Sequence, residues 1–211
     1  MISFKPTKVC KLCFCNITNN SLTHLIKSDL NLCPWCYQKL RPIFYKFKVD
    51  DYKAESIYQY NLDIKSLLYQ LKGCYDIEIA PIFFERFAFE YRLKYKGYIL
   101  VPAPSSKEDD LKREFNHVLE IYKVLKLPIE RIVEKIKQHK QSDHNREGRK
   151  EIIKVLQVVN GEKIRNKKVL IVDDVFTTGS TVRSIIKLLE PYKPKEIRVL
   201  VMSKTYDEDY I

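Results

Sequence analysis

Two adjacent carboxylates, Asp173 and Asp174, stand between an apolar run and a turn rich in hydroxyl groups. The run at residues 169–172 has the length and the β-branching of a strand that is buried on both faces. The turn at residues 177–181 leads into a helical pattern and can direct several backbone N–H groups at one phosphate. Carboxylates repel a phosphate, but they suit sugar hydroxyls or a divalent cation that chelates the sugar. The stretch therefore predicts a ribose 5-phosphate site, and the alternative is a buried strand and a capped helix that bind nothing.

Four of the six cysteines form two pairs, each with two residues between its members. Cys10 and Cys13 make the first pair, and Cys33 and Cys36 make the second. Two such knuckles are typical of a zinc ribbon, in which four thiolates close one structural site and leave no position open for catalysis. A thioredoxin-like redox pair and coincidence are the alternatives, but neither explains two pairs in this arrangement. The cysteines left over are Cys15 and Cys74.

The chain is strongly basic, with 38 lysines and arginines against 27 aspartates and glutamates and a formal net charge of +11. Such an excess favours polyanionic partners, nucleic acid first, although it can also serve solubility alone. No apolar run approaches the roughly 18 residues of a membrane span, and the first residues lack the core of a signal peptide. We therefore expect a cytoplasmic protein.

The pattern along the chain predicts a small metal-dependent module followed by one larger domain. A chain of 211 residues can bury a sizeable core, whereas residues 1–36 are too few to fold without a metal. Strand patterns then alternate with helical patterns, which is typical of an α/β doubly wound sheet. The expected strands are 56–60, 98–101, 132–136, 169–172 and 196–202, the expected helices are 62–71, 76–93, 114–126 and 182–189, and residues 152–159 fit either state.

Basic and aromatic residues alternate at residues 37–48, within the linker 37–54. Proteins that bind single-stranded nucleic acid use such side chains, the charges for the backbone and the rings for the bases. We favour the other interpretation, a linker helix whose rings pack on the next domain. A second basic stretch at residues 137–150 suits either a nucleic-acid groove or a mobile loop. The candidate DNA-binding residues are Lys39, Arg41, Phe44, Tyr45, Lys140, Arg146 and Lys150.

The stretch at residues 169–181 resembles the phosphoribosyl-pyrophosphate (PRPP) motif of type I phosphoribosyltransferases. In that family the acidic pair binds the ribose 2- and 3-hydroxyls, and the turn binds the 5-phosphate. Phe176 departs from the aliphatic residue usual at its position, and we expect it to pack nonetheless. The resemblance implies that PRPP, with Mg²⁺, binds at Asp173, Asp174, Val175, Thr177, Thr178, Gly179, Ser180 and Thr181.

The combination of a four-cysteine module with this motif resembles the ComF family of competence proteins, which natural transformation requires. Further matches along nearly the whole chain are Lys72-Gly73, Val101-Pro102-Ala103-Pro104, Arg113-Glu114-Phe115-Asn116, and Gln141 with Arg149 in a mobile loop. The resemblance implies a type I phosphoribosyltransferase-like, doubly wound and mostly parallel sheet, preceded by a zinc ribbon. The implied parts are the zinc-ribbon module 1–36, the basic and aromatic linker 37–54 and the phosphoribosyltransferase-like domain 55–211.

Two departures from the family pattern concern the pyrophosphate end of the implied site. Glu114 replaces the usual glycine, and three carboxylates at residues 108–110 occupy a segment that is usually basic. These carboxylates would oppose a bound pyrophosphate unless magnesium bridges them or they face solvent. The loop at residues 103–107 should bind pyrophosphate around a strained peptide. The implied pyrophosphate residues are Lys72, Ala103, Pro104, Ser105 and Arg113.

Two functions follow from the resemblance. The first is a competence protein that handles incoming single-stranded DNA, binds PRPP or a related phosphoribosyl ligand, and works with other DNA-uptake proteins. The alternative is an active phosphoribosyltransferase of nucleotide salvage. Its displacement reaction at ribose C1 would need magnesium, cations at the leaving pyrophosphate and a loop that excludes water. A zinc ribbon is not expected on a salvage enzyme, which favours the first function.

Overall fold

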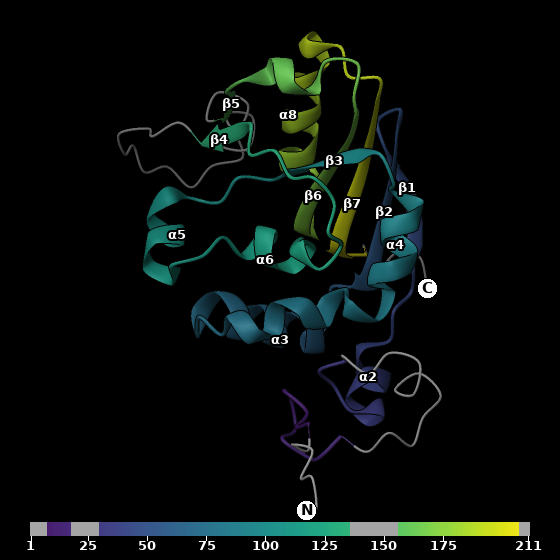
Figure 1. The fold of residues 1–211 in the computed structure, drawn as a ribbon, viewed down its shortest axis with the longest axis vertical. Helices are drawn as coiled ribbons and strands as arrows, with labels where there is room; N and C mark the ends of the chain where they lie inside the picture. The colour runs from purple at the N-terminus through teal and green to yellow at the C-terminus, as the bar shows by residue number, and fades with distance from the viewer. Residues whose placement is uncertain (1–7, 18–29, 136–155, 207–211) are drawn as a thin grey trace, which may run out of the picture.

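A five-stranded, mostly parallel sheet forms the centre of the computed structural model, which describes residues 8–17, 30–135 and 156–206 (Figure 1). The strands lie in the order β1-β2-β7-β6-β3. Their bounds are β1 Tyr45–Val49, β2 Tyr52–Gln59, β7 Glu196–Lys204, β6 Lys168–Phe176 and β3 Tyr98–Pro102. Strands β2, β7, β6 and β3 run parallel, whereas the edge strand β1 is antiparallel to β2. The predicted mostly parallel sheet is confirmed.

Helices cover both faces of the sheet because its central strands are apolar on both sides. On β6, Leu170 and Val172 belong to one core, and Val169 and Ile171 belong to the other. In Figure 1 the helices α3, α4 and α6 lie on one face and α8 lies on the other. The bounds of these helices are α3 Leu62–Gly73, α4 Ala88–Lys94, α6 His117–Lys123 and α8 Ser180–Leu189. The doubly wound α/β architecture is confirmed.

Local signals set the limits of several elements on these faces. Asn61 caps α3 by accepting a hydrogen bond from the backbone N–H of Ile64 at 3.0 Å. The helix predicted at residues 76–93 is wrong over its first half, where 3₁₀ turns replace it. Pro81 lies there and has no N–H to donate to an α-helical ladder, which accounts for the break. Within the described residues the 3₁₀ turns are η1 Ile77–Phe83, η2 Glu85–Phe87, η4 Gly161–Ile164 and η5 Glu190–Tyr192.

A small antiparallel pair of strands accompanies the face that carries α8. Its strands are β4 Val133–Lys135 and β5 Leu156–Val158. Val133 and Leu156 pack into the same core as α8. The strand predicted at 132–136 is therefore present, and the ambiguous segment 152–159 ends as a strand. In the part of the chain described here, no helix combines the length and the apolar character that crossing a bilayer requires.

A helix that the sequence did not lead us to expect, α5 Lys107–Arg113, precedes α6. Ser106 caps it by accepting a hydrogen bond from the backbone N–H of Asp109 at 3.0 Å. Glu114 ends α5 in the left-handed conformation with φ of 63°, and Asn116 then caps α6. The helix predicted from residue 114 is thus wrong at its start, because the left-handed residue separates two short helices. Glycine adopts this conformation readily, which explains why a glycine suits this position of the family pattern.

Replacing Glu114 with glycine should stabilise the protein. The left-handed conformation costs a non-glycine residue roughly 1–2 kcal/mol, and the greater freedom of an unfolded glycine offsets part of this gain. We expect Glu114→Gly to raise the free energy of unfolding in urea titrations by about 0.5 kcal/mol. The control Lys112→Gly lies inside α5, where glycine should lower that free energy by about 1 kcal/mol. Equal losses in both variants would contradict the strain that we assign to Glu114.

The cysteine module lies against the helical layer, beneath α3 in Figure 1, and carries the helix α2 Pro34–Leu40. The carboxylate of Glu85 in η2 accepts hydrogen bonds from the backbone N–H of Asn31 at 2.7 Å and from its side-chain amide at 2.6 Å. The hydroxyl of Tyr37 donates to the same carboxylate. Lys11 forms an ion pair with Glu78 in η1. These contacts attach the module to η1 and η2.

The linker that we considered as a single helix is built differently. Its start belongs to α2, but residues 45–49 form the edge strand β1, which pairs with β2 from Tyr45↔Ser56 to Val49↔Tyr52. The ring of Phe47 packs against that of Phe176, with centroids 4.9 Å apart. Side chains alternate along a strand, so the basic and aromatic alternation places the rings on one face and the lysines on the other.

Candidate functional site

The acidic pair lies near the C-terminal end of β6, at the edge where the carboxyl ends of the parallel strands meet. Ligands of parallel sheets bind beyond this edge. The hydroxyl of Tyr122 lies 2.7 Å from the backbone oxygen of Asp173 and 2.9 Å from that of Leu200. The hydroxyl of Ser203 donates to the backbone oxygen of Asp174 at 3.2 Å. These contacts from α6 and β7 hold the backbone of the pair in place.

Two side chains from other elements contact the carboxylate of Asp174. Lys72, in the last turn of α3, forms an ion pair with Oδ2. His117, the first residue of α6, places Nε2 at 3.1 Å from the same oxygen. Asp174 and His117 are each only 7% exposed, and a buried carboxylate requires such partners to remain charged. The fold thereby joins the end of α3 and the start of α6 to the acidic pair.

The contacts of His117 define its tautomer. Arg113 places Nη1 at 2.8 Å from Nδ1 of His117, and a guanidinium can only donate, so Nδ1 accepts. The proton therefore lies on Nε2, which donates to Asp174. Burial lowers the pKa of His117, the charges of Lys72 and Arg113 lower it further, and the contact with Asp174 acts in the opposite direction. The imidazole is accordingly neutral.

The two carboxylates of the pair have different proton affinities. Burial raises the pKa of Asp173 well above its ordinary value, and the adjacent charge of Asp174 raises it further. Burial also acts against the charged form of Asp174, but the hydrogen bond from His117 and the charge of Lys72 outweigh it. The pKa of Asp174 therefore lies below its ordinary value. Negative charge is concentrated on Asp174, while Asp173 takes up a proton more readily.

A cavity of about 510 Å³ opens at the acidic pair. Its lining includes every predicted pyrophosphate residue, namely Lys72, Ala103, Pro104, Ser105 and Arg113. It also includes four of the predicted PRPP residues, namely Asp173, Asp174, Val175 and Thr181. Residues that are far apart in the sequence thus share one hollow. The strained peptide implied for residues 103–107 is not found, because all described peptide bonds are trans and none of these residues has a positive φ.

The hydroxyl-rich turn stands at the N-terminus of α8, beside the cavity. Gly179 has φ of +74°, and a Cβ there would lie 2.3 Å from the ring of Phe176, so both the conformation and the close approach require glycine. Phe176 is 6% exposed, so it packs as expected. Arg183 donates from Nη1 to the backbone oxygen of Thr178 at 2.6 Å. The other predicted turn residues, Thr177, Thr178, Gly179 and Ser180, lie outside the cavity lining.

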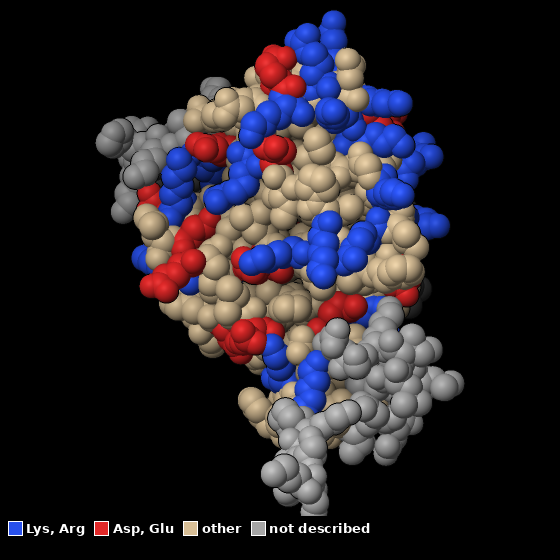
Figure 2. Space-filling view, in the orientation of Figure 1, with Lys and Arg blue, Asp and Glu red and all other residues tan. Residues whose placement is uncertain are grey.

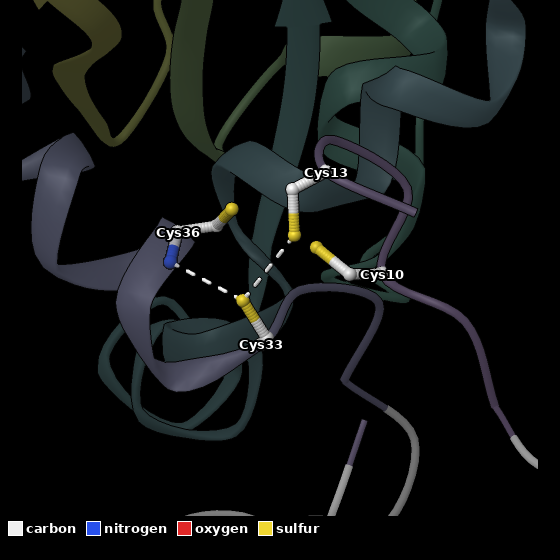
Figure 3. A group of neighbouring side chains, drawn as sticks. All are labelled: Cys10, Cys13, Cys33 and Cys36. Atoms are coloured by element: carbon white, nitrogen blue, oxygen red, sulfur yellow. Dashed lines mark hydrogen bonds between the residues drawn. The ribbon is translucent and has the colours of Figure 1, made fainter. Parts of the chain in front are cut away.

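The four paired cysteines come together in the module. Figure 3 shows Cys10, Cys13, Cys33 and Cys36 pointing toward one another, and their Sγ atoms lie within 4.8 Å of each other. Cys13 and Cys33 have Sγ atoms 3.7 Å apart, and a tetrahedral Zn²⁺ with Zn–S bonds of about 2.3 Å separates its sulfurs by roughly 3.8 Å. Four thiolates are the donor set of structural zinc, so these residues fit the ion.

The remaining two thiols lie outside this group of four. Cys15 is exposed, although its Sγ lies 3.3 Å from that of Cys13. Cys74 is also exposed and follows α3.

This chain is similar to known proteins that contain a phosphoribosyl transferase domain. Residues 118–206 match a family described as the phosphoribosyl transferase domain. The competence protein ComFC of Streptococcus pneumoniae is 29% identical over 143 residues, which are 68% of this chain and 64% of that protein. ComFC of Bacillus subtilis is 28% identical over 136 residues, which are 64% of this chain and 56% of that protein. These similarities support the resemblance to the ComF family that the sequence motifs indicate.

The chain spans less than two thirds of the length of both ComFC relatives. Among solved structures, a hypoxanthine phosphoribosyltransferase from Staphylococcus aureus is similar with 16% identity and a TM-score of 0.40, over 64% of this chain and 77% of the other. The family match, the mostly parallel sheet and the four-cysteine cluster confirm the predicted fold class.

The acidic segment that departs from the ComFC pattern is mostly turned away from the cavity. Glu108 is exposed, and Asp110 accepts hydrogen bonds from the hydroxyl of Ser105 at 2.5 Å and the amide of Asn116 at 2.8 Å. Of the three carboxylates, Asp109 lines the cavity. The hydrogen bond from Ser106 lowers the pKa of Asp109, and nearby positive charges act in the same direction. One charged group, rather than three, therefore faces the predicted pyrophosphate position.

The candidate DNA-binding residues of this ComFC relative are distributed over two elements. The ammonium of Lys39 lies 3.7 Å from the ring centroid of Trp35 in α2, and Arg41 is exposed at the end of that helix. Phe44 is 43% exposed and packs edge-on against Phe87, while Tyr45 is 41% exposed and stacks on Phe47. The candidates that lie outside the described residues are Lys140, Arg146, Lys150 and the mobile-loop residues Gln141 and Arg149.

His117 is the residue of the site that the sequence reasoning missed. It directly follows Asn116, the last residue of the family segment at residues 113–116. Extending that segment by one residue would have included His117 among the candidates. Lys135 of β4 also lines the cavity and had not been considered.

Proposed function

We propose that this ComFC relative is a competence protein that handles incoming single-stranded DNA during natural transformation and binds PRPP or a related phosphoribosyl ligand. The cavity at the acidic pair is the observation that carries the proposal. Its walls combine carboxylates for a sugar diol with cationic side chains for phosphates. The role in transformation is supported by the similarity to two ComFC competence proteins.

The cavity offers a place for each part of a phosphoribosyl ligand. Asp173 and Asp174 would accept hydrogen bonds from the ribose hydroxyls. The turn at residues 177–181 would bind the 5-phosphate at the N-terminus of α8, which has 10 residues. Lys72 and Arg113 would hold the pyrophosphate. Mg²⁺ would be held by the acidic pair and would supply positive charge to the ligand oxygens.

The cysteine cluster would hold a structural Zn²⁺, which would supply the folding energy that a small module lacks. We propose the zinc-ribbon module 1–36, the linker 37–54 and the phosphoribosyltransferase-like domain 55–211 as the three parts of the chain, with β1 of the linker added to the edge of the domain's sheet.

An active phosphoribosyltransferase is the second candidate function, and the intact cationic wall favours it. In that reaction positive charge grows on the ribose ring as pyrophosphate leaves C1. Lys72 and Arg113 would stabilise the leaving group, and Asp174 lies where it could stabilise the ring. The zinc module and the charged Asp109 at the cavity favour a binding protein instead.

Two measurements on the whole chain test these functions. Titration calorimetry with PRPP and Mg²⁺ should show saturable binding, and fluorescence anisotropy should show binding of a labelled single-stranded oligonucleotide that weakens as salt is raised. Pyrophosphate release with a panel of nucleobases should stay at background. Release with any base would favour the salvage enzyme, and absence of PRPP binding would contradict the assignment of the cavity.

A further inference from the structure

A second hollow, of about 520 Å³, lies between the outer strands of the sheet and the end of α4. It shares no lining residue with the cavity at the acidic pair. Arg198 of β7, which lines it, pairs with Leu170 of β6, four residues before Asp174. Strands rise by about 3.3 Å per residue, so Arg198 lies about 13 Å along the sheet from the level of Asp174. It is a separate feature of the surface.

The hollow is lined by five basic side chains and one carboxylate. The basic residues are Lys46, Lys48, Lys53, Lys94 and Arg198. The carboxylate belongs to Glu55, which is 6% exposed and already engaged, because Lys94 forms an ion pair with it and the hydroxyl of Tyr95 donates to it at 2.5 Å. Arg198 donates to Glu196 at 2.7 Å. Positive charge therefore dominates the hollow.

Three of the lysines form no ion pair within the described residues, although Lys46 stands opposite Glu55, the carboxylate that Lys94 already engages. Within residues 8–17, 30–135 and 156–206, no carboxylate forms an ion pair with Lys46, Lys48 or Lys53. In the register of β1 and β2, Lys48 stands directly opposite Lys53. Like charges in that position destabilise a sheet. Lys46 and Lys48 follow each other on one face of β1 at a spacing of about 7 Å. An extended polyanion would relieve this repulsion at several points at once.

Protection of the sheet edge explains part of this arrangement. β1 is an edge strand, and lysines on edge strands prevent pairing with other chains. This role accounts for Lys46 and Lys48. It does not account for Lys53 and Arg198, which lie on the inner strands β2 and β7, or for Lys94 on α4. The convergence of strands and a helix on one hollow therefore points to a ligand.

We propose that this hollow binds the phosphates of single-stranded nucleic acid, an inference that rests on the proposed DNA-handling function. Figure 2 shows lysine and arginine side chains gathered over the upper and right-hand part of this face, around and above α4 of Figure 1. A flexible single strand can bend its phosphates into a hollow, whereas a duplex is stiff over roughly 150 base pairs. The hollow thereby adds a DNA-binding region to the residues predicted from the sequence.

The test compares two double charge reversals in the whole chain. Lys48→Glu with Lys53→Glu changes the hollow, and Lys65→Glu with Lys187→Glu changes exposed lysines on α3 and α8. Each double variant lowers the net charge from +11 to +7, because each of two substitutions removes two charges. Anisotropy with a labelled single-stranded oligonucleotide should show at least about a tenfold loss of affinity for the hollow variant only. Its salt slope should become shallower by about 1.4, for two lost phosphate contacts.

Other outcomes separate this inference from the function on which it rests. Equal losses of affinity in the two variants would show that only the net charge matters, which would overturn the inference. No loss of affinity in either variant would overturn it as well. Charged side chains of either sign can protect an edge strand, so a role limited to edge protection predicts that the hollow variant binds the oligonucleotide unchanged. The milder pair Lys48→Gln with Lys53→Gln, with its fold checked by circular dichroism, should lose affinity in the same direction. If the unaltered protein binds no oligonucleotide even in dilute salt, the DNA-handling function fails, and this inference fails with it.

Discussion

Cys33→Ser should abolish zinc binding and make the cysteine module susceptible to protease, while the sheet stays folded. Structural zinc contributes roughly 10–16 kcal/mol of apparent binding energy in small modules. Serine preserves the hydrogen bond that caps α2, in which Sγ of Cys33 accepts from the backbone N–H of Cys36 at 3.5 Å. It is a poor zinc ligand, however. The substitution therefore removes the metal with little direct effect on the helix.

The measurement combines elemental analysis with limited proteolysis and mass spectrometry. The unaltered chain should contain one zinc, and Cys33→Ser should lose it and be cut within residues 10–36. The control Cys74→Ser changes an exposed thiol outside the cluster and should keep both the metal and the resistance to protease. A purified, folded chain with four free thiols and no metal would contradict the assignment.

Replacing both carboxylates, by Asp173→Asn with Asp174→Asn, should remove most of the affinity for PRPP. Each lost charge-assisted hydrogen bond costs on the order of 1.5–3 kcal/mol, so each substitution should cost about tenfold or more. Asparagine has nearly the same volume and can still accept the hydrogen bond from His117. The Lys72 side chain is 37% exposed and can turn toward water, which limits the cost of losing its partner to about 1 kcal/mol.

Asp109→Asn provides the matched control for this experiment. Asp109 lines the same cavity near the predicted pyrophosphate position. Removing its charge should leave PRPP affinity unchanged or raise it, since a carboxylate opposes an anionic ligand. Titration calorimetry at constant Mg²⁺ measures both variants. An unchanged affinity in the double variant, with the fold intact by circular dichroism, would contradict the role of the acidic pair.

The features that could be predicted from the sequence depend on short, contiguous motifs. The paired carboxylates and the hydroxyl-rich turn that follows them predict a phosphoribosyl site, and the spacing of the cysteines predicts a metal site. The cap at Asn61 is local in the same sense. The break between α5 and α6 is also local, but it depends on the left-handed conformation of Glu114. Glutamate rarely adopts this conformation, so the sequence does not predict the break.

The amino-acid sequence alone predicted an acidic pair at the end of a buried strand, a four-cysteine module and an alternation of strands and helices. The folded structure was needed to show that Lys72 and His117 both contact Asp174. It was also needed to show that β1 pairs with β2, which places Lys48 opposite Lys53. Periodicity in the sequence indicates which face of a helix or strand is apolar, whereas strand order and register arise from packing between distant segments. A charged site assembled across such segments becomes visible only once they are packed together.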